Sequence, residues 1–169
     1  MSCAGDPEIS RPFPAEAAEA RRLLVEASAR GPVRLDLPGL PATLTPAEAA
    51  RLASDGIPAA SIAFATDAPA ASPRLLLAFD TLAADPADLC AGLARIVPTS
   101  PHRLQAVLCE GGRSVASVSG SAAGPDAADT ERLVWRTTGQ LFPDDYPETY
   151  GLNLFPSWLR VGVGGSFGF

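Results

Sequence analysis

The chain has 169 residues, and its 19 acidic and 13 basic side chains give a net charge of −6 at neutral pH. A chain of this length can form one domain with a sizeable core, while an acidic surface repels phosphate backbones and anionic lipid headgroups. We therefore expect no nucleic-acid partner and no membrane association. No stretch approaches the roughly 18 uninterrupted apolar residues that a membrane-spanning helix needs.

The first half of the chain predicts short elements separated by proline-rich connections. Residues 1–12 contain acids and prolines rather than the basic start and apolar run of a signal peptide, and we expect them to be disordered. Apolar residues at helical spacing predict a helix over 13–30, and a Thr-Pro-Ala-Glu capping box opens a second helix over 45–55. The alternating stretch 33–37 predicts a short strand between these two helices.

The second half predicts the larger part of a sheet. Apolar runs at 61–66 and 74–80 predict two strands, and Asp85 is placed to cap a helix that continues to residue 97. The clearest signal is a hairpin over 103–120, because two apolar runs flank a Gly-Gly pair and glycine supplies the positive φ of a tight turn. A last helix is predicted over 126–142, with Val134, Trp135, Thr138, Leu141 and Phe142 on one side.

This order of elements predicts an α+β fold for residues 13–169. Successive strands without helical crossovers favour a single domain with a mostly antiparallel sheet of about four to six strands and helices on one face. Residues 143–169 form an aromatic C-terminal tail, which carries a large apolar load and alternates in its last part like a terminal strand. The tail is expected either to complete the core or to dock on another subunit.

Three cysteines, at positions 3, 90 and 109, are odd in number and widely spaced. This spacing matches neither a disulfide framework nor a zinc site. Cys90 falls in a predicted helix and Cys109 in a predicted strand, so we expect both to be small buried thiols. A reducing, cytoplasmic location fits this expectation.

Residues with catalytic chemistry are few. His102 is the only histidine, and an odd separation on a strand would direct it away from Cys109. Asp144, Asp145 and Glu148 form an acidic cluster, but their spacing matches no calcium loop. The glycines near the C-terminus precede no helix that could cradle a phosphate, and the chain has no lysine for a Walker motif. We predict no metal site and no cofactor.

The function that the sequence favours is a non-catalytic protein-binding or adaptor domain, with a protein partner or a second copy of the chain as its ligand. The predicted contact residues are aromatic and lie in the last helix and the tail: Trp135, Phe142, Tyr146, Tyr150, Phe155 and Trp158. The alternative is a small cytoplasmic enzyme that uses a carboxylate from the acidic cluster near His102.

Overall fold

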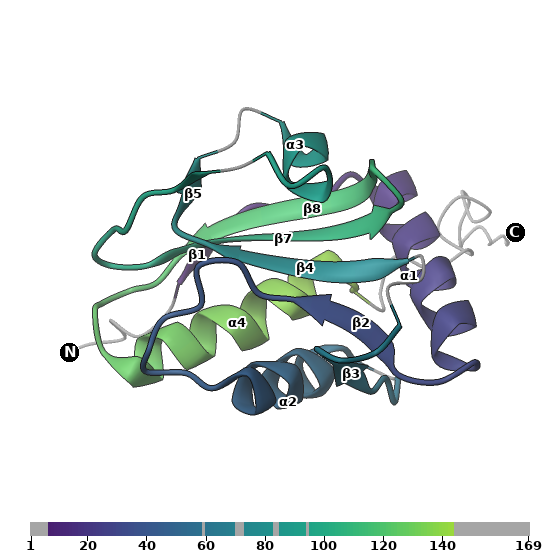
Figure 1. Cartoon of the computed structure of the whole chain (residues 1–169), viewed down its shortest axis with the longest axis horizontal. Coiled ribbons are helices and arrows are strands. Elements are labelled where there is room, and N and C mark those ends of the chain that lie inside the picture. Colours follow the sequence, from purple (N-terminus) through teal and green to yellow (C-terminus); the bar gives the residue numbers. More distant parts are fainter. Residues whose placement is uncertain (1–6, 59, 70–72, 83–84, 94, 144–169) are drawn as a thin grey trace, which may run out of the picture.

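The computed structural model describes residues 7–58, 60–69, 73–82, 85–93 and 95–143, which form one six-stranded sheet with helices on both sides (Figure 1). The helices in this part of the chain are α1 (Pro14–Ser28), α2 (Pro46–Gly56), α3 (Pro86–Cys90) and α4 (Ala127–Leu141). The sheet contains β1 (Glu8–Ile9), β2 (Val33–Asp36), β3 (Phe64–Ala65), β4 (Arg74–Phe79), β7 (Arg103–Glu110) and β8 (Arg113–Ser121). A separate ribbon pairs β5 (Thr81–Leu82) with β6 (Arg95–Ile96). The predicted α+β class is confirmed.

The sheet is mostly antiparallel, as the sequence predicts, with a parallel part at one edge. The strand order is β1-β8-β7-β4-β2-β3, and β2 is parallel to both of its neighbours. The parallel pairing of β2 with β3 follows from α2, since a helical crossover returns the chain in the same direction. The predicted hairpin is present as β7 and β8, and Gly111 adopts a φ of 65° at its turn.

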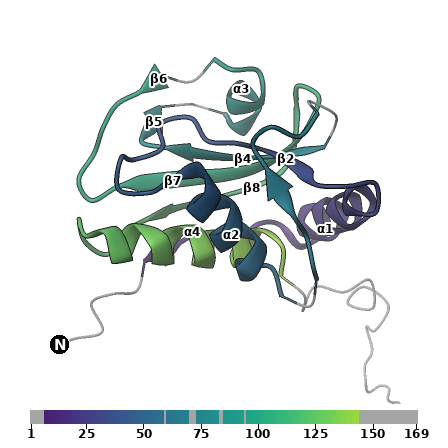
Figure 2. The ribbon, with the colours of Figure 1, turned by 60° about the horizontal axis from the view of Figure 1, so that its bottom comes forward.

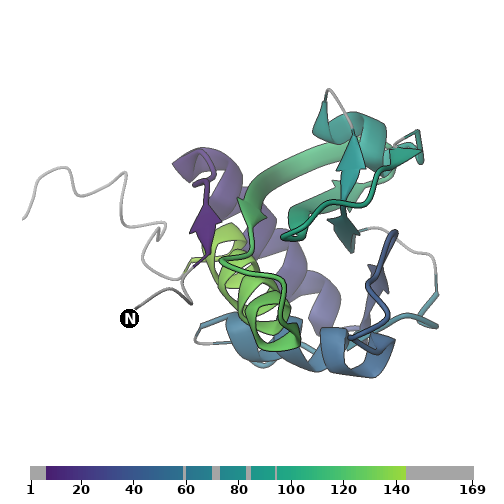
Figure 3. The same ribbon diagram turned by 90° about the vertical axis from the view of Figure 1, so that its left-hand side faces the viewer.

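The two faces of the sheet are covered unequally. Helices α1, α2 and α4 pack on one face, here called the inner face, and α3 lies with the β5–β6 ribbon on the other, the outer face (Figure 2). The end-on view shows α3 on the side of the sheet opposite to α2 and α4 (Figure 3). The sequence therefore places the three long helices correctly on one face, while the short α3 is an exception.

Alternation along the strands divides the core between these faces. Leu75, Leu77 and Phe79 of β4 join the large cluster beneath the three helices, together with Leu104, Ala106 and Leu108 of β7. The intervening residues Leu76, Ala78, Val107 and Cys109 form a small outer cluster with Leu89 and Cys90 of α3. The central strands are thus buried on both faces only where α3 covers them.

The prediction that the third helix continues to residue 97 is wrong. Helix α3 ends at Cys90, and Gly92 adopts a φ of 76°, a left-handed conformation that terminates helices. The expected core stripe does not form, because Leu93 is 72% exposed and Ile96 belongs to β6. Pairing with β5 competes successfully with helix formation over this stretch.

Both edges of the sheet also differ from expectation. Glu8 and Ile9, within the segment expected to be disordered, form β1 and pair with Ser121 and Gly120 of β8. At the opposite edge, the strand predicted over 61–66 is reduced to β3. Strands this short carry little periodicity, so their pairing depends on the neighbouring strand rather than on their own sequence.

Two glycines allow α2 and α4 to pack at close range. A Cβ at Gly56 would lie 2.5 Å from the carbonyl oxygen of Trp135, and one at Gly139 would lie 2.9 Å from that of Gly56. Both neighbouring atoms belong to the backbone and cannot rotate away. The close approach of α2 and α4 therefore requires glycine at these positions.

We expect Gly56→Ala to lower the free energy of unfolding by about 2 kcal/mol, because overpacking would force the two helices apart. Urea denaturation measures this loss. Gly112→Ala is the matched control, since a Cβ there meets no atom within 4 Å and we expect a change within about 0.5 kcal/mol. Equal urea midpoints for Gly56→Ala and Gly112→Ala would show that α2 and α4 can move apart without loss of stability.

Candidate functional site: an acidic corner, a polar groove and an exposed tryptophan

The end of β4 is organised around the carboxylate of Asp80. Asp80 follows the strand directly and adopts a φ of 54°, a left-handed conformation that aspartate tolerates better than most residues. Its backbone N–H donates to the carbonyl of Arg103 at 2.9 Å, and its carbonyl accepts from Val97 at 2.6 Å. These bonds direct the side chain into the loop that precedes β7.

The carboxylate of Asp80 accepts hydrogen bonds from three donors. Oδ1 accepts from Thr99 Oγ1 at 2.7 Å and from the Arg103 backbone N–H at 2.8 Å, while Oδ2 lies 2.7 Å from His102 Nδ1. Asp80 is only 5% exposed, and burial by itself raises the pKa of a carboxyl group. Hydrogen bonds from Arg103, Thr99 and His102 outweigh that effect and hold the pKa of Asp80 below its ordinary value.

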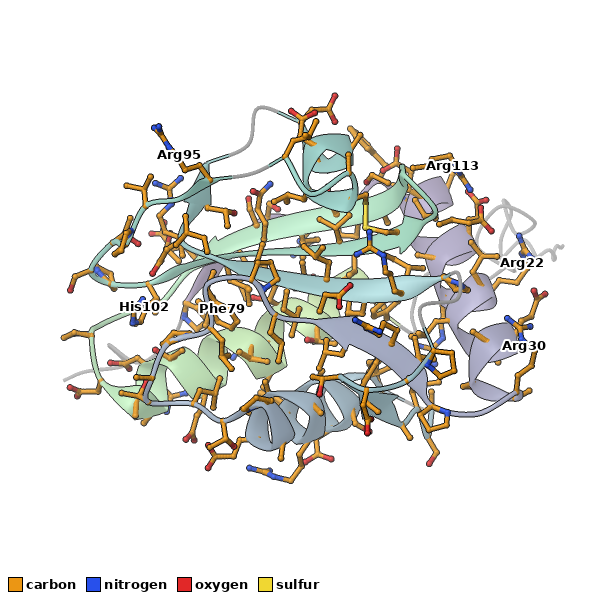
Figure 4. The ribbon with its side chains drawn as sticks, viewed as in Figure 1. Arg22, Arg30, Phe79, Arg95, His102 and Arg113 are labelled. Carbon is orange, nitrogen blue, oxygen red and sulfur yellow. A yellow bond between two sulfur atoms is a disulfide. The ribbon has the colours of Figure 1, made fainter. Side chains whose placement is uncertain are left out.

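The pair of Asp80 and His102 defines the orientation of the imidazole ring. An ionised carboxylate can only accept, so Nδ1 carries a proton, and in the neutral ring Nε2 is then the acceptor. The side chain of His102 is 28% exposed, and Nε2 has no hydrogen-bond partner within the described ranges. Figure 4 shows the labelled His102 at one end of the sheet, near Phe79, the residue that precedes Asp80.

This arrangement has part of the chemistry of a general base. A carboxylate that fixes a histidine tautomer is one component of nucleophilic and hydrolytic sites. Among the described residues, no serine, threonine or cysteine is hydrogen-bonded to His102. The same contacts also explain the loop structure, since Asp80 ties residues 97–103 to the end of β4.

A polar groove lies beside Asp80 on the outer face. It encloses about 510 Å³ and crosses the ends of four neighbouring strands. Polar side chains dominate its lining: Glu8, Ser10, Asp80, Thr81, Arg103, Gln105, Ser119 and Ser121. The sequence did not reveal this groove, because its residues come from strands whose register only the folded sheet defines.

An exposed tryptophan lies on the side of α4 that faces solvent, away from the sheet. Trp135 is 44% exposed and lines two shallow depressions, one on each side of it, of about 360 and 420 Å³. We call this the Trp135 surface; it is formed by α2 and α4 with the residues that follow each helix, and its lining comprises Leu52, Asp55, Gly56, Pro58, Ala128, Glu131, Arg132, Trp135, Arg136, Gly139, Gln140 and Pro143.

The predicted contact residues have different fates. Trp135 lies at the surface, apart from the buried Val134, Thr138 and Leu141 with which the sequence grouped it, whereas Phe142 is fully buried in the core. Phe142 is therefore inaccessible to a partner while the domain is folded. The remaining four, Tyr146, Tyr150, Phe155 and Trp158, lie outside the described residues, as do Asp144, Asp145 and Glu148.

The expectation for the cysteines is wrong in one respect. Cys90 and Cys109 are both buried, as predicted, but they form a disulfide that joins α3 to β7 across the outer face. A helix residue and a strand residue separated by 19 positions gave no sign of proximity in the sequence. The residues packed around the disulfide, Leu76, Val107 and Leu89, are ordinary apolar side chains and also gave no sign that the two cysteines are close.

The described ranges contain neither a group of three or more potential metal ligands nor a helix with the length and hydrophobicity to span a membrane. Comparisons of the chain with protein-family models, curated proteins and solved structures found no match. The functional interpretation therefore depends on the local chemistry of the sites described above.

Proposed function

We propose that the chain is a non-catalytic binding domain that docks on a protein partner through the Trp135 surface. The observation that carries this proposal is the exposure of Trp135 between two depressions. Tryptophan and arginine are enriched at the centres of protein interfaces, and Arg132 and Arg136 lie on the same surface. A partner that presents an apolar side chain beside charged or polar groups matches this surface chemically.

The last described residue of the chain belongs to the same surface. Pro143, the last described residue, lines the depression beside Trp135, so the aromatic segment begins at this surface. The expected contact residues Tyr146, Tyr150, Phe155 and Trp158 follow within 15 residues of Pro143. Their proximity along the chain makes them candidates to extend the contact that Trp135 starts.

Replacing Trp135 with arginine is expected to abolish partner retention, because it removes the apolar anchor and adds a charge to the interface centre. Val25→Arg is the matched control, since Val25 is also an exposed apolar helix residue, 46% exposed on α1. Native-host extracts passed over the three proteins should yield a partner with wild type and Val25→Arg but not with Trp135→Arg.

Solution mass distinguishes the occupants of this surface. Sedimentation of the purified chain should give a monomer, because the proposed partner is a different protein. A wild-type dimer that Trp135→Arg converts to a monomer would identify a second copy as the occupant instead. If wild type, Val25→Arg and Trp135→Arg retain the same proteins equally well, the Trp135 surface is not a docking site.

A carboxylate–histidine enzyme is the second candidate, and the 2.7 Å contact between Asp80 and His102 favours it. The carboxylate beside the imidazole ring is that of Asp80, which the sequence did not single out, whereas the 144–148 cluster that it named lies outside the described residues. Catalysis would use Nε2 of His102 as a base toward water or a bound hydroxyl. This candidate ranks second because loop anchoring accounts for the same contacts.

The disulfide changes the expected compartment. A cytoplasmic location was expected from cysteines interpreted as free thiols, but disulfides persist mainly in oxidising compartments. We therefore propose that the protein functions in an oxidising compartment. Alkylation of free thiols in intact native cells, followed by peptide mass spectrometry, should leave Cys90 and Cys109 unlabelled.

A further inference from the structure

The polar groove is a part of the outer face that α3 leaves uncovered. Helix α3 covers Leu76, Val107 and Cys109. Beyond these residues, toward the end of β4 and the start of β7, the outer face becomes polar. Arg103 and Gln105 alternate with the inner-facing Leu104, so both belong to the outer face. Polar residues on a sheet face that is buried elsewhere indicate a surface that contacts water or a polar ligand.

The strand register aligns these side chains in rows. Glu8 pairs with Ser121 and Ser121 pairs with Arg103, so an acid and a base lie on either side of Ser121, and Asp80 lies beyond Arg103. Neighbouring strands are about 4.8 Å apart, which separates the Cα atoms of Glu8 and Arg103 by about 10 Å. The next row places Ser119 opposite Gln105 and Gln105 opposite Ala78, whose small side chain leaves space above the sheet.

The charges of Glu8 and Arg103 are available for a ligand, whereas the carboxylate of Asp80 is engaged by Thr99, His102 and the Arg103 backbone N–H. Among the residues that the structure describes, neither the Glu8 carboxylate nor the Arg103 guanidinium forms an ion pair or a side-chain hydrogen bond. The lining also contains Thr81, whose buried Oγ1 has no hydrogen-bond partner in the described part of the chain. Buried polar atoms without a partner often mark positions that a ligand or water completes.

We propose that this groove binds a small zwitterion, with its carboxylate on Arg103 and its ammonium group on Glu8. A guanidinium group recognises carboxylates in a two-pronged geometry, and an ionised glutamate accepts from ammonium. Ser119, Ser121 and Gln105 supply hydrogen bonds between the two charges. An α-amino acid or a dipeptide has this charge arrangement, and the described residues of the lining include no aromatic platform for a flat apolar ligand.

Isothermal titration calorimetry on the full chain tests this proposal with four probes: alanine, dialanine, N-acetylalanine and alaninamide. The two zwitterions should bind, and each singly charged analogue should bind at least tenfold more weakly, because one charge-assisted contact is lost. Comparison of alanine with dialanine distinguishes a free amino acid from a short peptide. Circular dichroism confirms that every variant remains folded.

Two variants assign the charges. Arg103→Gln should weaken alanine binding about tenfold and remove the preference for alanine over alaninamide, and Glu8→Gln should remove the preference over N-acetylalanine. Arg95→Gln is the control, because Arg95 is exposed on β6 and does not line the groove (Figure 4). The proposal is overturned if no zwitterion binds at millimolar concentration, if the singly charged analogues bind equally well, or if Arg103→Gln and Glu8→Gln bind like wild type.

Discussion

Asp80→Ala is expected to lower the free energy of unfolding by about 3 kcal/mol at neutral pH. The substitution removes a buried acceptor and leaves the donors of His102 and Arg103 without their partner, while Thr99 Oγ1 keeps only the Pro101 carbonyl at 3.1 Å. Urea denaturation measures the loss. Asp67→Ala is the control, because Asp67 is an exposed acid and its removal should change the free energy by less than about 0.5 kcal/mol.

The stability conferred by Asp80 should depend on pH. Because the pKa of Asp80 is lowered in the folded state, its contribution is fully present above the unfolded-state pKa of about 4. As pH falls through the lower folded-state pKa, the carboxylate is protonated in both states and the contribution disappears. The difference between wild type and Asp80→Ala should therefore be constant above about pH 5 and should narrow below pH 4.

His102→Ala separates the structural role from the catalytic one. If the ring helps to anchor the loop, its removal should cost about 1 kcal/mol, the usual contribution of one hydrogen bond. Unchanged stability in His102→Ala, together with loss of a measurable hydrolytic activity, would favour the enzyme candidate instead. For the pH experiment on Asp80, the contradicting result is a difference in the free energy of unfolding between wild type and Asp80→Ala that does not change with pH, because an ionised Asp80 requires that change.

Loss of the disulfide is the second large effect that we expect. Reduction, or replacement of both Cys90 and Cys109 by alanine, should lower the free energy of unfolding by about 3 kcal/mol, because a cross-link over a loop of this length restricts the unfolded chain. Urea denaturation with and without dithiothreitol measures the change. Cys3→Ser should be included throughout, since a third thiol can exchange with the disulfide.

The double-alanine variant is also the control for the reductant. Its midpoint should be the same with and without dithiothreitol, whereas the midpoint of the disulfide-containing protein should fall. The disulfide assignment fails if the oxidised protein retains two titratable thiols at these positions. In that case the proposal of an oxidising compartment would lose its basis as well.

Local signals were sufficient for most of the fold. The capping box at Thr45, the Gly-Gly turn of the hairpin and the helical periodicity of α1 each predict an element from adjacent residues. Local signals failed at α3, where Leu93 and Ile96 fit a helical stripe but Gly92 ends the helix before them. A periodic pattern over a few residues is compatible with both a helix and a ribbon, and tertiary pairing decides between them.

The candidate sites depend on contacts between distant positions. Asp80 and His102 are separated by 22 residues, and Cys90 and Cys109 by 19. Glu8 and Arg103 are on strands that do not pair with each other, and both residues are paired with Ser121 of β8, which lies between them. Single-sequence patterns describe neighbours along the chain, so they named His102 only as a candidate and did not pair it with Asp80.

The measurement that most directly tests the binding proposal is photocrosslinking from position 135 in the native host. A photoreactive amino acid that replaces Trp135 should form a covalent adduct with a distinct protein, whereas the same group at Val25 should form none. Adduct formation requires contact at the labelled position, so it places the partner on the Trp135 surface. A folded protein that gives no adduct from position 135, or the same adducts from both positions, would contradict the account.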